Sequence, residues 1–323
     1  MKIEIEENSH ADESWNKRLL NSIGTVYQTK EYAAFTNSAF GWNTKFLKFI
    51  EPKGEILGQL MISTYPRFGK KDLKRKVLGK LPGTKKMVYW WLCGPVVFKP
   101  EYKNDICKAL KQFLVSKNVR VSGSEHPFLR NQLSCLQSPF KIKPWGTFLI
   151  DLSLDLDTLW KKMDKHSARK NIERARERGV VVKKMKRSDL KEHHKMLRET
   201  KRKVGEEVEL STVEKLWDNL EPIGVTGFLA RKNEEPISSL VISNFNGYLN
   251  EWGVARTEID NEEKLYSQDL IKWEIIRWGI ENKFEYYDLS GVNLHPENKK
   301  EQGIFRYKKK FGGELYSYNL VNL

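Results

Sequence analysis

The stretch VTGFLARKNEEPISSLVISNFNGYLNEWG, residues 225–253, carries the pattern that decides the fold. Two runs rich in apolar and β-branched residues, 225–231 and 237–245, flank a short polar turn. A third apolar run, 248–252, ends at Gly253. Runs of this length that are bounded by turn residues predict strands, so we expect a hairpin followed by a third strand.

A helix and a fourth strand complete this unit. Apolar residues recur at helical spacing over Leu265–Glu281, and the run Tyr286–Ser290 ends at Gly291. The earlier half of the chain repeats the order of hairpin, strand, helix and strand. The elements expected there are a short helix at 28–38, strands at 44–50, 56–65 and 87–93, a helix at about 106–114 and a strand at 119–122. We therefore expect an α+β protein made of two units with one topology.

One long helix is expected between the two units. The segment Asp155–Arg178 begins with acidic residues, which suit a helix N-terminus, and its apolar stripe includes Leu159 and Met163. Gly179 supplies the C-terminal stop, and a strand follows at 180–182.

Length and composition agree with two packed domains. The chain has 323 residues, of which 39% are hydrophobic, and a usual domain has about 150 residues. The three cysteines, Cys93, Cys107 and Cys135, are widely spaced and form no Cys-x-x-Cys pair. We expect structural cysteines in a reducing cytoplasm rather than a secreted disulfide scaffold. The acidic N-terminus does not resemble a secretory signal, and the longest nearly apolar run, Met87–Phe98, is shorter than the ~20 residues of a membrane span.

Positive charge is concentrated in three segments of a chain whose net charge is +15. Lys161–Lys203 has 18 basic and 6 acidic residues, Pro66–Lys86 has 9 and 1, and Lys299–Lys310 has 6 and 1. The rest of the chain is net acidic. Each segment alone is compatible with a solvated surface, but three together favour an anionic partner such as a nucleic acid, a phosphate-bearing substrate or a membrane surface.

Several segments, taken in order, carry a resemblance to a known family. They are Tyr27-Gln28-Thr29-Lys30-Glu31-Tyr32 with Phe40-Gly41-Trp42; Gly94-Pro95-Val96; Asp151-Leu152-Ser153 with Leu159-Trp160 and Arg169-x-x-Ile172-x-x-Ala175-x-x-x-Gly179-Val180; and Asp288-Leu289-Ser290-Gly291 with Gly303-Ile304-Phe305-x-Tyr307-Lys308-x-x-Phe311-Gly312-Gly313. Together they resemble the Fem family of aminoacyltransferases, which build peptide bridges on peptidoglycan precursors from aminoacyl-tRNA. The order of elements is likewise similar to that of the acyl-CoA N-acyltransferases (GNAT).

The resemblance implies two tandem GNAT-like domains. Residues 1–150 with 315–323 would form the acceptor side and residues 151–314 the donor side, so that the last strand returns to the first domain. It also implies transfer of an amino acid from aminoacyl-tRNA to an amine of an anionic, peptidoglycan-type cell-envelope precursor, without cofactor or metal. The protein would meet an anionic membrane surface only peripherally. Thr36 stands where the family often has a lysine that helps to hold the precursor's phosphates, so the acceptor stays open.

Motifs of other chemistries are missing. The chain has no Gly-x-Ser-x-Gly, no Walker sequence and no His-Glu-x-x-His order around His193. Residues 260–264, before the 265–281 helix, are acidic and lack glycine, which disfavours binding of the coenzyme A pyrophosphate. The alternative is a thioester (CoA)-dependent N-acyltransferase acting on a surface-glycan amino sugar. A third interpretation is a protein that only binds RNA or an anionic membrane.

Three residues are candidates for catalysis. The resemblance implies that Lys308 stabilises charge near the transferred acyl group, although it could also be a surface lysine of the run 308–310. Glu251 lies where acyltransferase folds often place a general base. Asp288 closes a strand, where it would orient the amine or the tRNA 3′ end, or serve the structure alone.

The remaining candidates are binding residues. Those expected to contact substrate are Gln28, Tyr32, Trp42, Trp252, Tyr266 and Tyr307. Trp252 and Tyr266 would stack on the terminal adenosine unless they belong to the core. Those expected to contact tRNA phosphates are Arg169, Lys170, Arg174 and Arg176.

Overall fold

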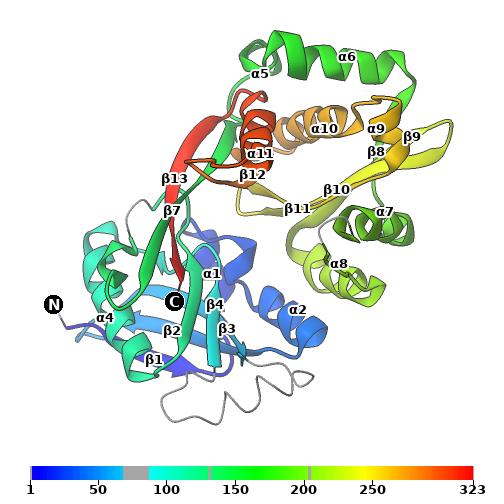
Figure 1. Ribbon diagram of the computed structural model, residues 1–323. Coiled ribbons are helices and arrows are strands. Elements are labelled where there is room, and N and C mark those ends of the chain that lie inside the picture. Colours follow the sequence, from blue (N-terminus) through cyan, green and yellow to red (C-terminus); the bar gives the residue numbers. More distant parts are fainter. Residues whose placement is uncertain (1, 68–86, 130–131, 203–204, 323) are drawn as a thin grey trace. The chain divides into compact units, whose positions relative to one another are not determined.

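The computed structural model describes residues 2–67, 87–129, 132–202 and 205–322 (Figure 1). They form two compact units: Met1–Trp145 with Ser317–Leu323, and Gly146–Tyr316. Each unit combines one mixed β-sheet with helices, which confirms the α+β class. The basic segment expected at Pro66–Lys86 lies, from residue 68 onward, outside the described residues.

The sheet of unit 1 has the strand order β1-β2-β3-β4-β6-β13. Its strands are β1 Glu4–Asn8, β2 Asn43–Ile50, β3 Ile56–Pro66, β4 Met87–Trp91, β5 Val96–Val97 (paired with β3), β6 Arg120–Ser124 and the end of β13 Glu314–Asn322. Its helices are α1 Trp15–Leu20, α2 Lys30–Phe40 and α4 Lys103–Ser116. All neighbouring strands are antiparallel except β4 and β6, which α4 connects as a parallel pair.

The sheet of unit 2 repeats this topology in the order β8-β9-β10-β11-β12-β7. Its strands are β7 Lys141–Asp151, β8 Val180–Lys184, β9 Val225–Lys232, β10 Glu235–Phe245, β11 Tyr248–Arg256 and β12 Tyr286–Val292. Its helices are α5 Leu156–Lys162, α6 Lys170–Glu177, α7 Leu190–Arg202, α8 Leu210–Gly224, α9 Glu258–Glu262, α10 Ser267–Glu281 and α11 Lys299–Lys309. Here β11 and β12 form the parallel pair, connected through α10. Each predicted strand and helix of the two units is found, with β11 continuing past the expected stop at Gly253.

The two sheets exchange their last strands. β7 follows β6 in sequence, but its residues from Gly146 onward pair with β12 of unit 2. β13 follows β12, but Leu320–Asn322 pair antiparallel with Ser122–Ser124 of unit 1. Each unit is therefore completed by a strand from the other half of the sequence.

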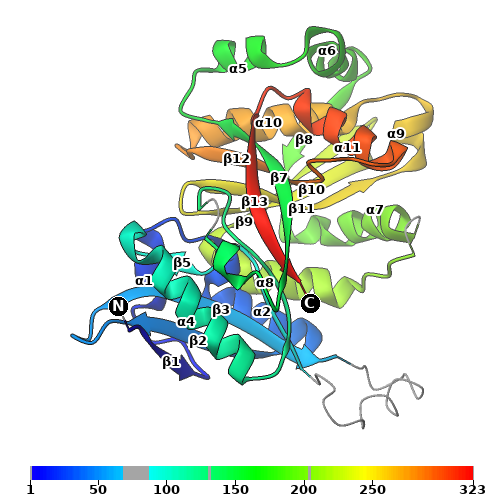
Figure 2. The same ribbon diagram turned by 60° about the vertical axis from the view of Figure 1, so that its left-hand side comes forward.

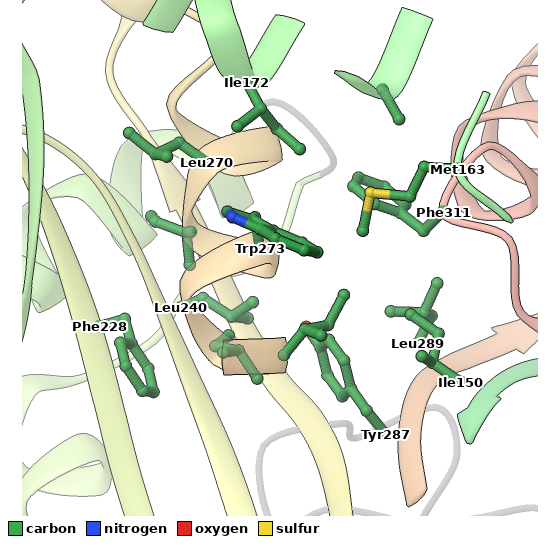
Figure 3. Close-up of a cluster of buried hydrophobic side chains, with 14 of the residues drawn as sticks. Ile150, Met163, Ile172, Phe228, Leu240, Leu270, Trp273, Tyr287, Leu289 and Phe311 are labelled. Atoms are coloured by element: carbon green, nitrogen blue, oxygen red, sulfur yellow. The ribbon is translucent and has the colours of Figure 1, made fainter. Parts of the chain in front are cut away.

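The helices of unit 2 form layers on both faces of its sheet (Figures 1 and 2). α10 packs on one face and α6 packs on the outer side of α10, while α7 and α8 cover the opposite face. Figure 3 shows the core around α10, where Trp273 lies among Ile172 of α6, Leu240 of β10 and Met163. The basic segment Lys161–Lys203 therefore does not form one surface: α5 and α6 lie on one side of the sheet and α7 lies on the other.

The prediction of one long helix over Asp155–Arg178 is wrong. α5 ends at Lys162, and a π-helical turn, Lys165–Arg169, begins a second helical segment that continues as α6. Asp164 causes the break, because its carboxylate accepts hydrogen bonds from the backbone N–H groups of His166 (3.0 Å) and Ser167 (2.7 Å). An aspartate that caps a new helix start competes with continuation of the old helix.

The cysteines also depart from the expectation. Cys107 of α4 forms a disulfide with Cys135, and Cys93 is a free thiol. The sequence separation of 28 gives no hint of this pair, because the fold alone brings the two cysteines together. Among the described residues, no helix combines the length and the apolar character that crossing a membrane requires.

Candidate active site

The candidate site of unit 2 lies where two parallel strands separate. β11 and β12 pair only over Tyr248–Asn250 and Tyr286–Asp288. Beyond this point both strands bulge. Trp252 is an extra residue of β11 relative to β10, and the two residues Leu289 and Ser290 of β12 lie opposite a single residue of β7. Bulges redirect side chains and often border functional sites. The strand ends thus turn polar groups of β11 and β12 toward α10 and α11.

Glu251 is buried and already paired. Its carboxylate oxygen Oε1 forms an ion pair with Lys272 of α10 and accepts a hydrogen bond from the Tyr287 hydroxyl at 2.7 Å. The side chains of Glu251 and Lys272 are only 6% and 2% exposed. A carboxylate that two donors engage in this way is a poor general base, so the structure does not support that expectation for Glu251.

Asp288 is buried and accepts three hydrogen bonds. They come from the Thr147 hydroxyl, the Tyr248 hydroxyl at 2.5 Å and the backbone N–H of Ser290 at 2.7 Å. Burial raises the pKa of Asp288, and these hydrogen bonds oppose the rise. Through these contacts Asp288 holds the local backbone, which agrees with the structural role that the sequence analysis gave as its alternative.

Lys308 reaches the same place from α11. Its Nζ donates to the backbone carbonyl oxygens of Ser290 and Gly291, each at 3.0 Å. Burial lowers the pKa of Lys308, nearby Lys272 lowers it further, and the carboxylates of Glu251 and Asp288 oppose the change. Its neighbour Lys309 is exposed. Lys308 is thus no ordinary surface lysine of the run 308–310.

Tyr307 lies between two buried ion pairs. Lys310 pairs with Asp269 of α10, and the Lys310 Nζ lies 4.3 Å from the centre of the Tyr307 ring. The Nζ of Lys272, the partner of Glu251, lies 5.8 Å from the same ring. Burial, with Asp269 and Glu251 nearby, holds the pKa of Tyr307 well above its usual value. The Tyr307 hydroxyl is buried and has no hydrogen-bond partner within the described part of the chain.

The N-terminus of α10 is occupied by protein carboxylates. Asp260 is fully buried and accepts the backbone N–H of Ser267 at 3.1 Å, and Arg256 donates to its other oxygen at 2.6 Å. Asp269 adds a second carboxylate in the first turn of the helix, where it pairs with Lys310. A pyrophosphate needs free N–H groups at such a helix end. The structure thus adds to the sequence evidence against a coenzyme A site in this unit.

Tyr266 and the α6 arginines form a separate group. The guanidinium carbons of Arg174 and Arg178 lie 6.0 and 5.5 Å from the centre of the Tyr266 ring. Arg176 pairs with Glu274 of α10 at 3.1 Å.

The other two expected tRNA contacts differ in exposure. Lys170 is exposed, whereas the Nε of Arg169 is buried without a partner among the described residues. Within the described part of the chain, these contacts of Tyr266, Arg174 and Arg176 do not include Lys308.

The candidates of unit 1 are divided between core and surface. Gln28 is fully buried, and its side-chain amide donates to Leu92 O at 2.7 Å and accepts from Met61 N at 2.8 Å. This amide links two backbone segments, so the Gln28 side chain is engaged within the protein. Thr36 is also buried, 3.4 Å from the Ser63 hydroxyl, so its position faces the interior.

Tyr32 and Trp42 belong to an aromatic cluster. Trp42 stacks on Tyr65 with ring centres 4.4 Å apart, and buried Tyr32 lies 6.3 Å from Trp90. A separate groove of about 890 Å³ runs between α2 and the strands, with Lys30 and Lys45 in its lining.

Sequence reasoning missed several members of the site. Lys272 and Asp269 are charged residues in the most deeply buried helix of unit 2, whose other residues are largely apolar. A lysine among the apolar residues Leu270, Ile271 and Trp273 is the signal that could have identified Lys272 as a site residue. Ser290 gave a weaker signal, as a small polar residue directly before Gly291.

The comparisons with known proteins agree on the fold. No protein-family model and no curated protein matches the sequence. Among solved structures, FemX is similar over 97% of this chain and 96% of its own, with 14% identity and a TM-score of 0.71. L-PGS from Bacillus licheniformis matches 98% of this chain and 92% of its own, with 12% identity and a TM-score of 0.56. A tandem GNAT protein from the clavulanic acid biosynthesis pathway matches 99% of this chain and 97% of its own, with 9% identity and a TM-score of 0.55. The expected tandem GNAT-like fold is confirmed, and the resemblance to Fem proteins holds at the level of the fold.

Proposed function

We propose that this protein is an aminoacyltransferase that moves an amino acid from aminoacyl-tRNA to an amine of an anionic cell-envelope precursor. The observation that carries the proposal is Lys308, a partly buried lysine held by two backbone carbonyls where β11 and β12 separate. The likeness of the fold to FemX and to L-PGS supports a transferase of this kind.

Lys308 has the chemistry that acyl transfer requires. In the reaction the acceptor amine attacks the ester carbonyl, a tetrahedral oxyanion forms, and the ribose oxygen leaves with a proton from the amine. An ammonium group has three N–H donors, and two of those of Lys308 face the Ser290 and Gly291 carbonyls. The third donor is available to the oxyanion. Such a contact is stronger in the transition state than in the ground state, so it raises turnover.

The donor is proposed to be an ester on tRNA rather than a thioester of coenzyme A. Asp260 occupies the helix N-terminus where a pyrophosphate would bind. Exposed basic residues of α5, the π-helical turn and α6, including Lys161, Lys162, Lys165 and Lys170, instead offer contacts to a phosphate backbone. These helices adjoin the site, because the backbone N–H of Asp164 donates to Lys310 O at 2.9 Å.

The acceptor is proposed to bind unit 1. The groove between α2 and the strands has room for a muropeptide-sized ligand. Lys30 in its lining favours an anionic one, whereas Lys45 is already paired with Glu7. Stacked Trp42 and Tyr65 offer an aromatic surface on the same unit. With Thr36 buried, phosphate contacts would come from other cations.

A two-donor assay tests the proposal. The protein is incubated with nucleotide-linked or lipid-linked peptidoglycan precursors and either total tRNA charged with labelled amino acids or labelled acetyl-CoA. We expect label to reach the precursor only from tRNA, and RNase treatment of the donor to abolish transfer. Transfer from acetyl-CoA with tRNA inert would overturn the proposal in favour of the thioester-dependent alternative.

A further inference from the structure

Ser290 has an uncommon backbone conformation beside the candidate catalytic lysine. Its φ angle is +64°, in the left-handed region that disfavours residues other than glycine, asparagine and aspartate. It lies in the bulge of β12, between Asp288 and Gly291. A strained residue persists only where its surroundings hold it, and such residues gather at functional sites.

Two contacts hold Ser290 in this conformation. Its backbone N–H donates to Asp288 Oδ1 at 2.7 Å, within the same strand. Its hydroxyl donates to the backbone carbonyl of Glu251 at 2.9 Å. The hydroxyl thus bridges β12 to β11 beyond the last backbone pair of these strands, Asn250 with Asp288.

The backbone carbonyl of Ser290 faces Lys308. The carbonyl oxygen of Ser290 accepts from Lys308 Nζ at 3.0 Å. Gly291, directly after it, supplies the second carbonyl that Lys308 contacts. The direction of both carbonyls depends on the left-handed turn at Ser290.

We propose that Ser290 is the positioning residue for Lys308. Its hydroxyl fixes β12 to β11, and the turn fixed in this way directs two carbonyls at the Lys308 ammonium. The role rests on the proposed function, since it acts through Lys308. Losing the hydroxyl would let the turn relax and leave the ammonium with fewer acceptors.

The charged groups around Lys308 decide the sign of the effect on pH dependence. Glu251 of β11, Asp288 of β12 and Lys272 of α10 are the charged groups that act on it. Glu251 is shared with Lys272, so the two carbonyls are the direct acceptors of the ammonium. Losing them favours neutral Lys308, and the alkaline limb of the rate profile should move to lower pH.

Two substitutions separate the hydroxyl from the backbone strain. Ser290→Ala removes the hydroxyl and keeps a side chain that disfavours the left-handed backbone, whereas Ser290→Gly removes both. We expect both variants to lower kcat roughly tenfold, to leave KM for charged tRNA within about twofold, and to shift the alkaline limb of kcat to lower pH. The melting temperature of Ser290→Gly should equal or exceed that of Ser290→Ala, because glycine tolerates φ of +64°.

The matched control is Ser122→Ala, at the corresponding place before Gly123 in β6 of unit 1. Ser122 has no left-handed backbone, and its hydroxyl contacts Asn322 at 3.4 Å. This variant should keep the kcat and the pH profile of the parent protein. Competitive labelling of lysine amines, read by mass spectrometry, gives the reactivity of Lys308 without any activity assay. Lys308 should become more reactive at neutral pH in both Ser290 variants and stay unchanged in the control.

The outcomes distinguish this inference from the proposed function. If Lys308→Ala abolishes transfer while both Ser290 variants keep the parent kcat, pH limb and Lys308 reactivity, Ser290 has no positioning role and the function stands. If Lys308→Ala has no effect on transfer, the assignment of Lys308 is wrong. Shifted limbs and altered Lys308 reactivity in both Ser290 variants support the inference.

Discussion

Lys308, Lys309 and Lys310 are consecutive residues with three different environments. Lys308 Nζ contacts two carbonyls, Lys310 pairs with Asp269, and Lys309 is exposed. Successive residues of a helix point about 100° apart, so a run of like charges need not share one surface. A basic run at the end of α11 therefore contains two partly buried cations, Lys308 and Lys310, that lie at the candidate site.

The environment of Lys308 predicts the pH dependence of transfer. Burial lowers its pKa, and only the protonated form stabilises an oxyanion, so kcat should fall as pH rises through that lowered pKa. The fall should occur at lower pH than for an ordinary lysine. Lys308→Arg keeps its charge throughout and should lose this alkaline limb, even if its kcat is lower. Single-turnover rates from charged tRNA between pH 6 and 10 would test this, and an unchanged limb in Lys308→Arg would assign it to another group.

His193 predicts how the stability of unit 2 responds to acid. It is buried on α7 with Nδ1 2.8 Å from the Ser239 hydroxyl, and burial lowers its pKa to about 4. The unfolded chain takes up the proton near pH 6.5 and the folded chain only near pH 4, so stability falls as pH drops through this window. The loss should approach about 3 kcal/mol. His193→Asn should flatten this slope in hydrogen-exchange measurements of α7, whereas an equally steep slope would exclude His193 as its source.

At the scale of elements, most strands were predictable, but the break within the 155–178 helical segment of unit 2 was not. Each predicted strand is an apolar run between turn residues, so local sequence defines it. β1, with the sequence Glu4-Ile-Glu-Glu-Asn8, is largely acidic and was not predicted. The segment 155–178 has helical periodicity throughout, but Asp164 starts a new helix and its N–H bonds to Lys310, far away in sequence. Helical periodicity in a sequence cannot reveal a side-chain cap or a contact with a residue far away in the chain.

The site could be predicted only in part, for the same reason. Lys308 was identified because its local motif resembles that of a family. The partners of Glu251 and Asp288 were not, because Lys272, Tyr248 and Thr147 lie on other elements. Glu251 was predicted to be a general base, but in the structure its buried carboxylate forms an ion pair with Lys272.

The division of the basic segment between two faces predicts which elements bind RNA. Lys165 and Lys170 lie on the α5–α6 side, next to the site, and Lys191 and Lys195 lie on α7 across the sheet. Replacing Lys165 and Lys170 by Gln should weaken tRNA binding and reduce the log–log salt slope by roughly 1.5. The matched pair Lys191→Gln and Lys195→Gln should change neither. Filter binding at several salt concentrations measures both, and a reversed result would place the RNA on α7.

At the scale of the whole molecule, the exchange of strands makes each unit depend on a distant segment. Asn319 of β13 donates to buried Glu125 through its backbone N–H at 2.8 Å and its side chain at 3.2 Å. Val321 is fully buried in the unit 1 core. Residues 317–322 thus complete a core that begins at the other end of the sequence.

Removing Ser317–Leu323 should therefore destabilise unit 1 selectively. Glu125 would lose two donors while staying buried, and the core would lose Val321, so we expect a loss of about 3 kcal/mol or more. Hydrogen exchange should show faster exchange in β6, with β11 and β12 serving as an internal control that keeps its protection. Equal loss of protection in both units would contradict the independence of their cores.

The most direct test of the central claim compares Lys308→Ala with Lys309→Ala in single-turnover transfer from charged tRNA. If Lys308 stabilises the oxyanion, its loss should lower the transfer rate roughly 100-fold or more, with tRNA affinity nearly unchanged. Lys309→Ala removes an exposed charge from the same helix and should keep the rate of the parent protein. Equal rates for the two variants would contradict the claim that aminoacyl transfer takes place at Lys308.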